Sequence, residues 1–271
     1  MKHATLPALV DIGANLTHDS FDADRVAVLE RARMHSVTRF VVTGSDALHS
    51  RRALDLCGEY PGLYATAGVH PHHAKDCTRA TPCELRDLLR ESRVVAAGEC
   101  GLDYFRNFSP PEVQRDVFSM QLTLAVESGK PVFLHQRDAH ADFLDILSAY
   151  RPRLSRAVVH CFTDGPAELE DYLALDCHIG VTGWVCDERR GEKLRSCISR
   201  IPADKLMIET DAPYLLPRDL TPKPASHRNE PMHLAHICRV VARLRGMDAA
   251  ELARVTTVNA ERFFALPAEP G

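Results

Sequence analysis

The stretch KPVFLHQRDAH, from Lys130 to His140, begins as a short apolar run and then ends on a histidine. Its apolar part is typical of a strand buried in a sheet, and His135 follows that part directly. The chain repeats the pattern 25 residues later, where RAVVHCF places His160 after three small apolar residues. Two histidines thus fall at the ends of two predicted buried strands, so we expect them to serve one purpose.

Eight such runs occur along the chain, and polar or ionisable residues follow each of them. The runs are ALVDIG (8–13), RFVVTG (39–44), LYATAGVH (63–70), RVVAAGE (93–99), KPVFLH (130–135), RAVVH (156–160), CHIGVTG (177–183) and KLMIETD (205–211). Helical spacing of apolar residues between runs is seen at Val26/Leu29/Ala32, at Val117/Met120/Leu124/Val126 and at Phe143/Leu144/Leu147. Strands that alternate with helices predict a parallel sheet, and eight such units predict an α/β fold of the (β/α)8 TIM-barrel class. A doubly wound open sheet is the alternative.

Length and composition fit one globular domain over residues 1–271. The chain has 271 residues, of which 45% are hydrophobic and 26% charged, values that allow a sizeable core. Its net charge of -4 excludes a global positive field. Any contact with nucleic acid therefore requires a local basic patch.

Cysteine usage and the N-terminal residues indicate a cytoplasmic protein. The nine cysteines include no C-x-x-C pair, and the residues before Asp11 are too few and too interrupted for a secretory signal. Free thiols are expected in a reducing compartment. No apolar run reaches the roughly 18 to 20 residues that span a bilayer, so we expect no membrane partner.

In a barrel of this class, the active site is built at the C-terminal ends of the strands. Four of the predicted strands end in ionisable groups, namely Glu99, His135, His160 and Asp211. Two imidazoles and two carboxylates form a mixed nitrogen and oxygen donor set that suits a divalent cation, either Mg²⁺ or Mn²⁺, and is compatible with Zn²⁺. The alternative for the two carboxylates is a salt bridge that closes the barrel mouth.

A metal in such a site would support hydrolysis. It polarises a carbonyl or phosphoryl oxygen and lowers the pKa of bound water, while a carboxylate such as Asp211 takes the proton. Asp211 and Glu99 are therefore the predicted catalytic residues. Glu209 lies two residues before Asp211 and is expected either to support it or to form an ion pair in the barrel interior.

The motifs of the whole chain resemble those of the TatD family of metal-dependent deoxyribonucleases. They are DIGANLT, TAGVHPHH, GECGLDYFRNFSPPEVQ, LHQRDAH, VVHCFTDG, IGVTGWVCDERRG and IETDAPYLLPRDLTPKP with RNEP, in that order. The resemblance covers Asp11 to about Phe264. It implies a barrel hydrolase of the amidohydrolase superfamily that is Mg²⁺-dependent and cytoplasmic, with a role in DNA repair or nucleic-acid turnover. It also implies removal of nucleotides from single-stranded DNA or RNA in the 3′ to 5′ direction.

The resemblance places the family's metal ligands on the four residues already selected. The glutamate falls on Glu99, the two histidines on His135 and His160, and the late aspartate on Asp211. The wider superfamily ends its first strand in His-x-His, whereas this chain has Gly13 and Asn15 there. We therefore expect a second metal ion to bind weakly, together with substrate phosphate. Asn15 is a candidate for holding a water or a phosphate oxygen, or else is a turn residue.

Further polar residues near the strand ends are candidates for binding substrate. We expect His70 and His72 to bind or orient phosphate, as the family suggests, and His73 to lie on the surface. Arg106 and Arg137 could neutralise a backbone phosphate. Two cations in a later loop are further candidates of the same kind, Lys223 and Arg228.

Aromatic residues after the strand ends could stack on bases, which tolerates any base sequence. We expect this role for Tyr104 and Trp184, and expect Phe105 and Phe162 to fill the top of the barrel instead. The partner is predicted to be single-stranded DNA or RNA, because no positively charged stripe is available to follow two backbones. The protein itself is expected to be a monomer.

Two other functions stay open at the level of sequence. One is a metallo-hydrolase acting on another bond, such as an aminoacyl-tRNA ester or a small amide, because a fold does not fix the substrate. The other is a binding protein without catalysis. Retention of all four ligand positions argues against the second function.

Overall fold

The computed structural model describes residues 5–267, and within them every one of the eight predicted runs forms a strand. The strands are β1 (Leu9–Ala14), β2 (Val37–Val42), β3 (Leu63–Ala67), β4 (Val94–Asp103), β5 (Val132–Arg137), β6 (Ala157–Val159), β7 (His178–Val181) and β8 (Leu206–Ile208). They form one eight-stranded sheet in chain order, from β1 to β8. The predicted (β/α)8 class is confirmed.

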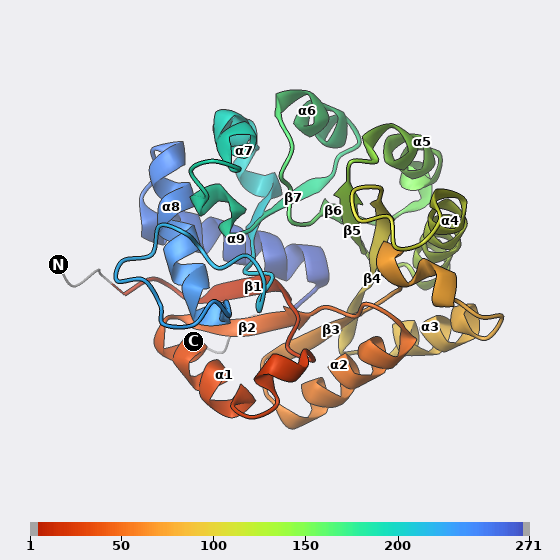
Figure 1. Ribbon diagram of the computed structural model, residues 1–271, viewed down its shortest axis with the longest axis horizontal. Coiled ribbons are helices and arrows are strands. Elements are labelled where there is room, and N and C mark those ends of the chain that lie inside the picture. Colours follow the sequence, from red (N-terminus) through yellow and green to blue (C-terminus); the bar gives the residue numbers. More distant parts are fainter. Residues whose placement is uncertain (1–4, 268–271) are drawn as a thin grey trace. The chain divides into compact units, whose positions relative to one another are not determined.

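Helices separate the strands in the alternating order that the sequence predicts (Figure 1). The α-helices are α1 (Arg25–Met34), α2 (Ala47–Glu59), α3 (Thr81–Arg90), α4 (Pro111–Ser128), α5 (His140–Tyr150), α6 (Pro166–Ala174), α7 (Glu192–Cys197), α8 (Leu234–Arg245) and α9 (Ala249–Phe264). The short 3-10 helices are η1 (Asp19–Phe21), η2 (Pro71–Asp76), η3 (Arg151–Arg153), η4 (Gly183–Cys186), η5 (Ile198–Arg200), η6 (Ala203–Lys205) and η7 (Pro231–His233). None of the described helices is both long and apolar enough to cross a membrane.

The described residues cluster into two compact units. The first comprises residues 5–41, Cys161–Leu169 and residues 179–267, and the second comprises Val42–His160 and Glu170–His178. The expectation of a single domain over residues 1–271 stays a prediction.

In the second unit, parallel strands β3 to β6 pair in sequence, and helices α3, α4 and α5 pack against β4 and β5 (Figure 1). All ten residues of β4 are buried. Phe118 of α4 stacks on Phe143 of α5, with ring centroids 5.1 Å apart. Burial on both faces explains why these strands read as continuous apolar runs rather than as alternating patterns.

Glycine lets β4 approach β5 where the candidate site begins. Gly101 pairs with His135 in the parallel register and has φ +147, a conformation that other residues rarely adopt. A Cβ atom at Gly101 would collide with the carbonyl oxygen of His135. The same strand carries Glu99, so this close approach brings the ends of the two strands together.

In the first unit, backbone hydrogen bonds join the residues after β8 to the end of β1. The amide of Asp211 donates to the carbonyl of Gly13 at 2.8 Å, and the amide of Asn15 donates to the carbonyl of Ala212 at 2.7 Å. Helix α9 packs against both strands. These bonds fix Asp211 and Asn15 next to one another.

Candidate metal centre

His70 is oriented by the turn that follows β3. It caps η2, where its Nδ1 atom accepts the backbone N–H of His72 at 3.1 Å, and Pro71 begins the helix. Proline suits the first helical position because its φ is already helical and the missing N–H has no partner there. With Nδ1 occupied, the Nε2 atom lies 3.5 Å from Oε1 of Glu99.

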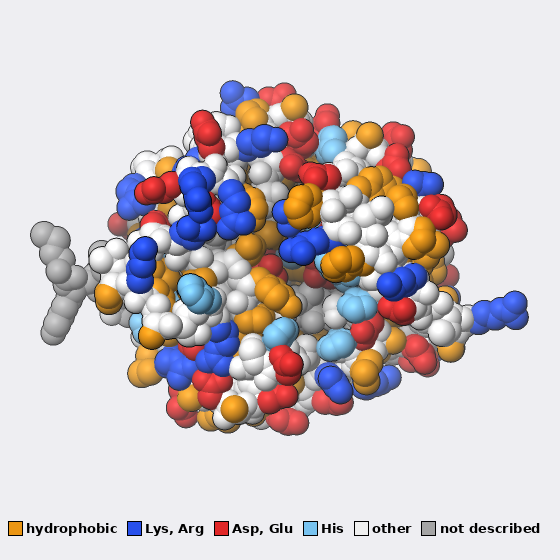
Figure 2. Space-filling model, in the orientation of Figure 1, with side chains coloured by type: hydrophobic (Ala, Val, Ile, Leu, Met, Phe, Trp, Pro, Cys, Tyr) orange, Lys and Arg blue, Asp and Glu red, His pale blue; other side chains and the backbone are white. Residues whose placement is uncertain are grey.

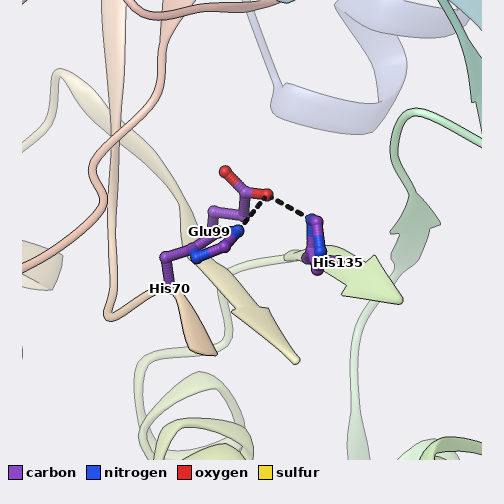
Figure 3. A group of neighbouring side chains, drawn as sticks. All are labelled: His70, Glu99 and His135. Atoms are coloured by element: carbon purple, nitrogen blue, oxygen red, sulfur yellow. Dashed lines mark ion pairs between the residues drawn. The ribbon is translucent and has the colours of Figure 1, made fainter. Parts of the chain in front are cut away.

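Glu99 lies on β4 and is approached by imidazoles from three other elements. His135 Nδ1 is 2.8 Å from its Oε1 atom, and His160 Nε2 is 2.6 Å from the same atom. Figure 3 shows the side chains of His70 and His135 converging on the Glu99 carboxylate. Histidine side chains also gather on the molecular face over β3 and β4, beside acidic ones (Figure 2). The Oε1 atom of Glu99 therefore lies within 3.5 Å of a nitrogen of each of three imidazoles.

Three of these side chains meet the geometric requirement for holding a metal ion. One donor atom from each of His70, Glu99 and His135 lies within 4.8 Å of the others. Nitrogen and carboxylate oxygen donors suit a divalent cation. The structure thus brings His70 into the donor group, whereas the sequence analysis assigned it to substrate phosphate.

Asp103 is a member of this cluster that the sequence analysis missed. It ends β4 and is almost fully buried. Its Oδ2 atom lies 2.8 Å from Nε2 of His72 and 3.4 Å from Nε2 of His135. Its Oδ1 atom accepts the backbone N–H of Arg106 at 2.8 Å. The sequence carries a signal for it. In the motif GECGLDYFRN, Asp103 follows Glu99 by four residues, and residues two or four apart lie on the same side of a strand.

Burial and neighbouring charges perturb the protonation of the cluster. Burial acts to raise the pKa of Glu99, but the imidazoles of His160, His70 and His135 outweigh it and hold the pKa well below its ordinary value. Burial lowers the pKa of His70 well below 6.5. For His135, burial is opposed by Asp103 and Glu99, and the pKa is raised. Glu99 is therefore ionised and His70 is neutral, and because Nδ1 of His70 accepts the N–H of His72, its Nε2 carries the proton and faces the Glu99 carboxylate.

Asp211, the fourth predicted ligand, lies in the first unit beside Asn15. Asn15 Nδ2 donates to Asp211 Oδ1 at 2.9 Å, so the amide orients the carboxylate. Glu209 is fully buried and accepts the backbone N–H of Cys161 at 2.6 Å. The metal role of Asp211 stays a prediction from the sequence.

Arg137 and Arg106, the predicted phosphate-binding residues, flank Phe105. The guanidinium of Arg137 lies 4.0 Å from the centroid of the Phe105 ring, and that of Arg106 lies 5.8 Å from it. Phe105 is 53% exposed, so the expectation that it fills the top of the barrel is wrong. It follows β4 in an open turn, where the two arginines cover it instead of core residues.

Other aromatic candidates differ in exposure. The Tyr104 hydroxyl donates to Asp142 at 2.7 Å, which ties it to α5. Trp184 is half-buried, its Nε1 donates to the carbonyl of Arg190, and the guanidinium of Arg190 lies 4.5 Å from its ring. Phe162 is buried, as expected. Phe108 is 54% exposed and lies 4.7 Å from the His72 ring.

The two loop cations have different environments. Arg228 binds the carboxylates of Asp24 and Glu230 at 2.8 Å each, so it ties the loop to the start of α1 rather than offering its charge to a phosphate. Lys223 is exposed. Of the two, Lys223 better fits the expected contact with phosphate.

A (β/α)8 sheet with imidazole and carboxylate donors at the C-terminal ends of its strands is the architecture of metal-dependent barrel hydrolases. The family described as "TatD related DNase" matches residues 10–265. The chain is 52% identical to a protein of Erwinia tasmaniensis named "3'-5' ssDNA/RNA exonuclease TatD", over 95% of this chain and 100% of the relative. It is 50% identical to a protein of the same name from Edwardsiella piscicida, with the same coverage. The chain belongs to the TatD-related DNase family and is a hydrolase.

Solved structures agree with this assignment. The TatD homologue YJJV of Escherichia coli superposes with a TM-score of 0.87 at 30% identity, over 96% of this chain and 98% of that one. A TatD-family hydrolase of Entamoeba histolytica superposes with a TM-score of 0.88 at 25% identity, over 97% of this chain and 100% of that one. A β-aspartyl dipeptidase of Fervidobacterium islandicum, at 15% identity and a TM-score of 0.62, shares the fold alone.

Proposed function

We propose that this protein is a metal-dependent exonuclease that hydrolyses single-stranded DNA and RNA from the 3′ end. The observation that carries the proposal is the convergence of His70, Glu99 and His135 within 4.8 Å of one another, in a chain that belongs to the TatD-related DNase family. Relatives named as exonucleases of this specificity match it over their full length. We further propose a monomer in the cytoplasm, with a role in DNA repair or nucleic-acid turnover.

The donor set fits a divalent cation. Glu99 contributes an ionised carboxylate, and the imidazoles of His135 and His160 lie within 3 Å of it. We propose that these three residues hold the ion, with His70 adjacent and Asp211 completing the set as the sequence predicts. Mg²⁺ is the proposed ion of the reaction, and the imidazole-rich surroundings make Mn²⁺ and Zn²⁺ the ions to compare with it.

When bound, the ion would polarise a phosphoryl oxygen and lower the pKa of a water molecule. The side chains supply the remaining functions. Asp211, oriented by the amide of Asn15, is the proposed base that accepts the proton of the attacking water. Asp103 holds His72 through a 2.8 Å contact, which fixes the ring for contact with a phosphate oxygen.

Substrate binding is proposed to use the exposed turn after β4. Arg137 and Arg106 carry positive charge next to Phe105, and Phe108 presents a second exposed ring beside His72. Cations neutralise backbone phosphates and aromatic rings stack on unpaired bases, so this turn suits a single strand. Tyr104 and Trp184 stay candidates for the same task.

The deciding experiment follows an end-labelled single-stranded oligonucleotide with Mg²⁺, Mn²⁺ or Zn²⁺ and with EDTA. The wild-type protein should shorten the strand from its 3′ end, and EDTA should stop the reaction. His135→Ala should slow cleavage by at least about 100-fold, because it removes a metal donor. Asp116→Asn on the exposed face of α4 is the matched control and should cleave like the wild type.

The same assay can overturn the proposal. If wild-type protein leaves oligonucleotides intact with all three ions but hydrolyses an aminoacyl-tRNA ester or a small amide, the nuclease assignment falls. The barrel and its donor cluster would then serve another bond.

A further inference from the structure

A second group of donor atoms lies in the first unit, made of Cys186, Asp219 and His236. One atom from each side chain, the thiol sulfur, a carboxylate oxygen and an imidazole nitrogen, lies within 4.8 Å of the other two. Among residues 5–267, only this group and the one around Glu99 meet that criterion. The candidate function described above uses none of the three.

The three residues come from separate parts of the chain. Cys186 ends η4, Asp219 belongs to the long loop between β8 and η7, and His236 lies in the first turn of α8. His236 Nε2 is 2.7 Å from Asp219 Oδ1. Helix α8 packs against η4, so the thiol and the imidazole are held on adjoining elements.

The surroundings fix the thiol but leave the site open to solvent. Thr182 caps η4 by accepting the N–H of Trp184 at 3.2 Å, and Arg195 donates to the carbonyl of Val185 at 3.1 Å. Cys186 is 3% exposed, whereas the side chains of Asp219 and His236 are 27% and 29% exposed. The carboxylate and the imidazole are therefore in contact with solvent, while the sulfur beside them is buried.

We propose that Cys186, Asp219 and His236 bind a Zn²⁺ ion, with solvent as the fourth ligand. Sulfur, nitrogen and carboxylate oxygen are the three donor types that zinc uses in proteins, and a thiolate selects against Mg²⁺. Binding displaces the thiol proton, which leaves to solvent, so one thiolate and one carboxylate balance the charge of the ion. Neutral His236 binds through Nε2 and keeps its proton on Nδ1.

The distances suit this ion after a small adjustment. Ligand atoms around a tetrahedral zinc lie roughly 3.2 to 3.8 Å apart, given bonds of about 2.0 to 2.3 Å. The Asp219–His236 contact of 2.7 Å must therefore open by about an ångström or less, and the sulfur already lies within 4.8 Å of both other ligand atoms. Both ligands with exposed side chains have room for such a movement.

Zinc would link three segments that come from separate parts of the chain. It would fasten the loop after β8 to η4 and α8, and η4 also carries Trp184, two residues before Cys186. The site is thus proposed as structural, and it does not depend on the proposed nuclease function. Zinc should raise the melting temperature of the protein, because an ion that binds only the folded state stabilises it.

Co²⁺ is the spectroscopic probe for this site, because a thiolate ligand gives Co²⁺ a strong near-ultraviolet charge-transfer band. No cysteine belongs to the donor group around Glu99, so the band reports the second site. Metal-free full-length protein titrated with Co²⁺ should develop the band, and added Zn²⁺ should abolish it by displacement. Cys186→Ala should lose the band.

Two cysteine variants serve as matched controls. Cys161→Ala removes the thiol that follows His160, and Cys197→Ala removes a buried thiol that contacts backbone carbonyls. Both should keep the band. If the wild type shows no band at saturating Co²⁺, or if Cys186→Ala keeps it, the proposal is overturned.

A second measurement tests the proposal even if the Cys186→Ala variant misfolds. His236→Gln and Asp219→Asn keep the thiol and the approximate side-chain volume, and each should weaken Zn²⁺ binding at least tenfold in competition with a chromophoric chelator. Circular dichroism of the metal-free variants should match the wild type. Unchanged Zn²⁺ affinity in both variants would overturn the proposal even where the Cys186 variant fails to fold.

Discussion

His160 Nε2 lies 2.6 Å from Glu99 Oε1, and this contact joins the end of β6 to the buried middle of β4. The same oxygen lies 2.8 Å from His135 Nδ1. A carboxylate buried to this extent is stable only with partners that offset its lost hydration. Here the imidazoles are those partners. A cation that displaces the imidazole protons would bind the same imidazole nitrogens and the same carboxylate oxygen.

Glu99→Gln should abolish metal binding at this cluster while keeping the fold. Glutamine has nearly the same shape but no charge, so the imidazoles lose their anionic partner and a cation loses its carboxylate ligand. We expect the affinity for Mn²⁺, measured by isothermal titration calorimetry, to fall at least about 100-fold. A variant that binds Mn²⁺ as tightly as the wild type would show that Glu99 is not a ligand.

Asp103→Asn tests the carboxylate that the sequence analysis missed. Asp103 fixes the ring of His72 and places its charge 3.4 Å from Nε2 of His135, so its loss should weaken metal binding by about 10- to 100-fold without removing a donor. Calorimetry with Mn²⁺ measures the effect, and Asp116→Asn on the exposed face of α4 is the control. Equal affinities for the two variants would argue that Asp103 only packs the end of β4.

Gly101→Ala should destabilise the protein by about 2 to 4 kcal/mol. The added Cβ would collide with the carbonyl oxygen of His135, at a φ of +147 that alanine rarely adopts. Gly58→Ala on α2 is the matched control, since a Cβ there meets nothing within 4 Å. Helix propensity should make this control more stable by about 0.5 kcal/mol. Urea unfolding measures the change in the free energy of unfolding of both variants. A Gly101→Ala variant as stable as the wild type would refute the close approach of β4 to β5.

Protein stability should fall between pH 6.5 and about pH 4 in a way that depends on His233. Burial lowers the pKa of His233 from 6.5 to about 4. The unfolded chain therefore binds a proton in this window that the folded chain does not, so acid favours unfolding. Above pH 6.5 neither state is protonated and the effect is absent.

The His233→Asn variant isolates this contribution. Asparagine does not titrate, and its amide can reach the position of His233 Nδ1, which contacts the side chain of Asn229 at 2.9 Å. Melting temperatures measured from pH 7 to pH 4 should fall less steeply for the variant than for the wild type. Parallel curves would mean that His233 does not titrate in this range.

Arg137→Ala should weaken binding of single-stranded oligonucleotides and change its salt dependence. If Arg137 neutralises one phosphate, the slope of log affinity against log salt should become shallower by about 0.7. Fluorescence anisotropy in a Glu99→Gln background measures binding without cleavage. Arg86→Ala is the control, because Arg86 is paired with Glu127 on the outer helices. An unchanged slope in Arg137→Ala would remove this residue from the interface.

Sequence reasoning predicted the strands well because each is buried on both faces and therefore reads as an apolar run. It placed His135 and His160 at strand ends, and the structure brings both to Glu99. Phe105 was wrongly expected in the core, because an aromatic residue after a strand looks the same in sequence whether arginines or core residues cover it. Arg228 was expected to contact phosphate, but it is paired with Glu230 two residues away and with Asp24, which lies far away in the chain.

The sequence by itself determined the (β/α)8 class, the order of its strands and the residues that end them. Local periodicity and burial carry that information, because each run must bury its own apolar side chains. Only the tertiary structure decided that Asp103 supports His72, that His70 joins the donor group, and that Cys186 meets His236. These pairings join segments distant in the chain, and the separation between two side chains depends on strand register and turn geometry, which residue types alone do not specify.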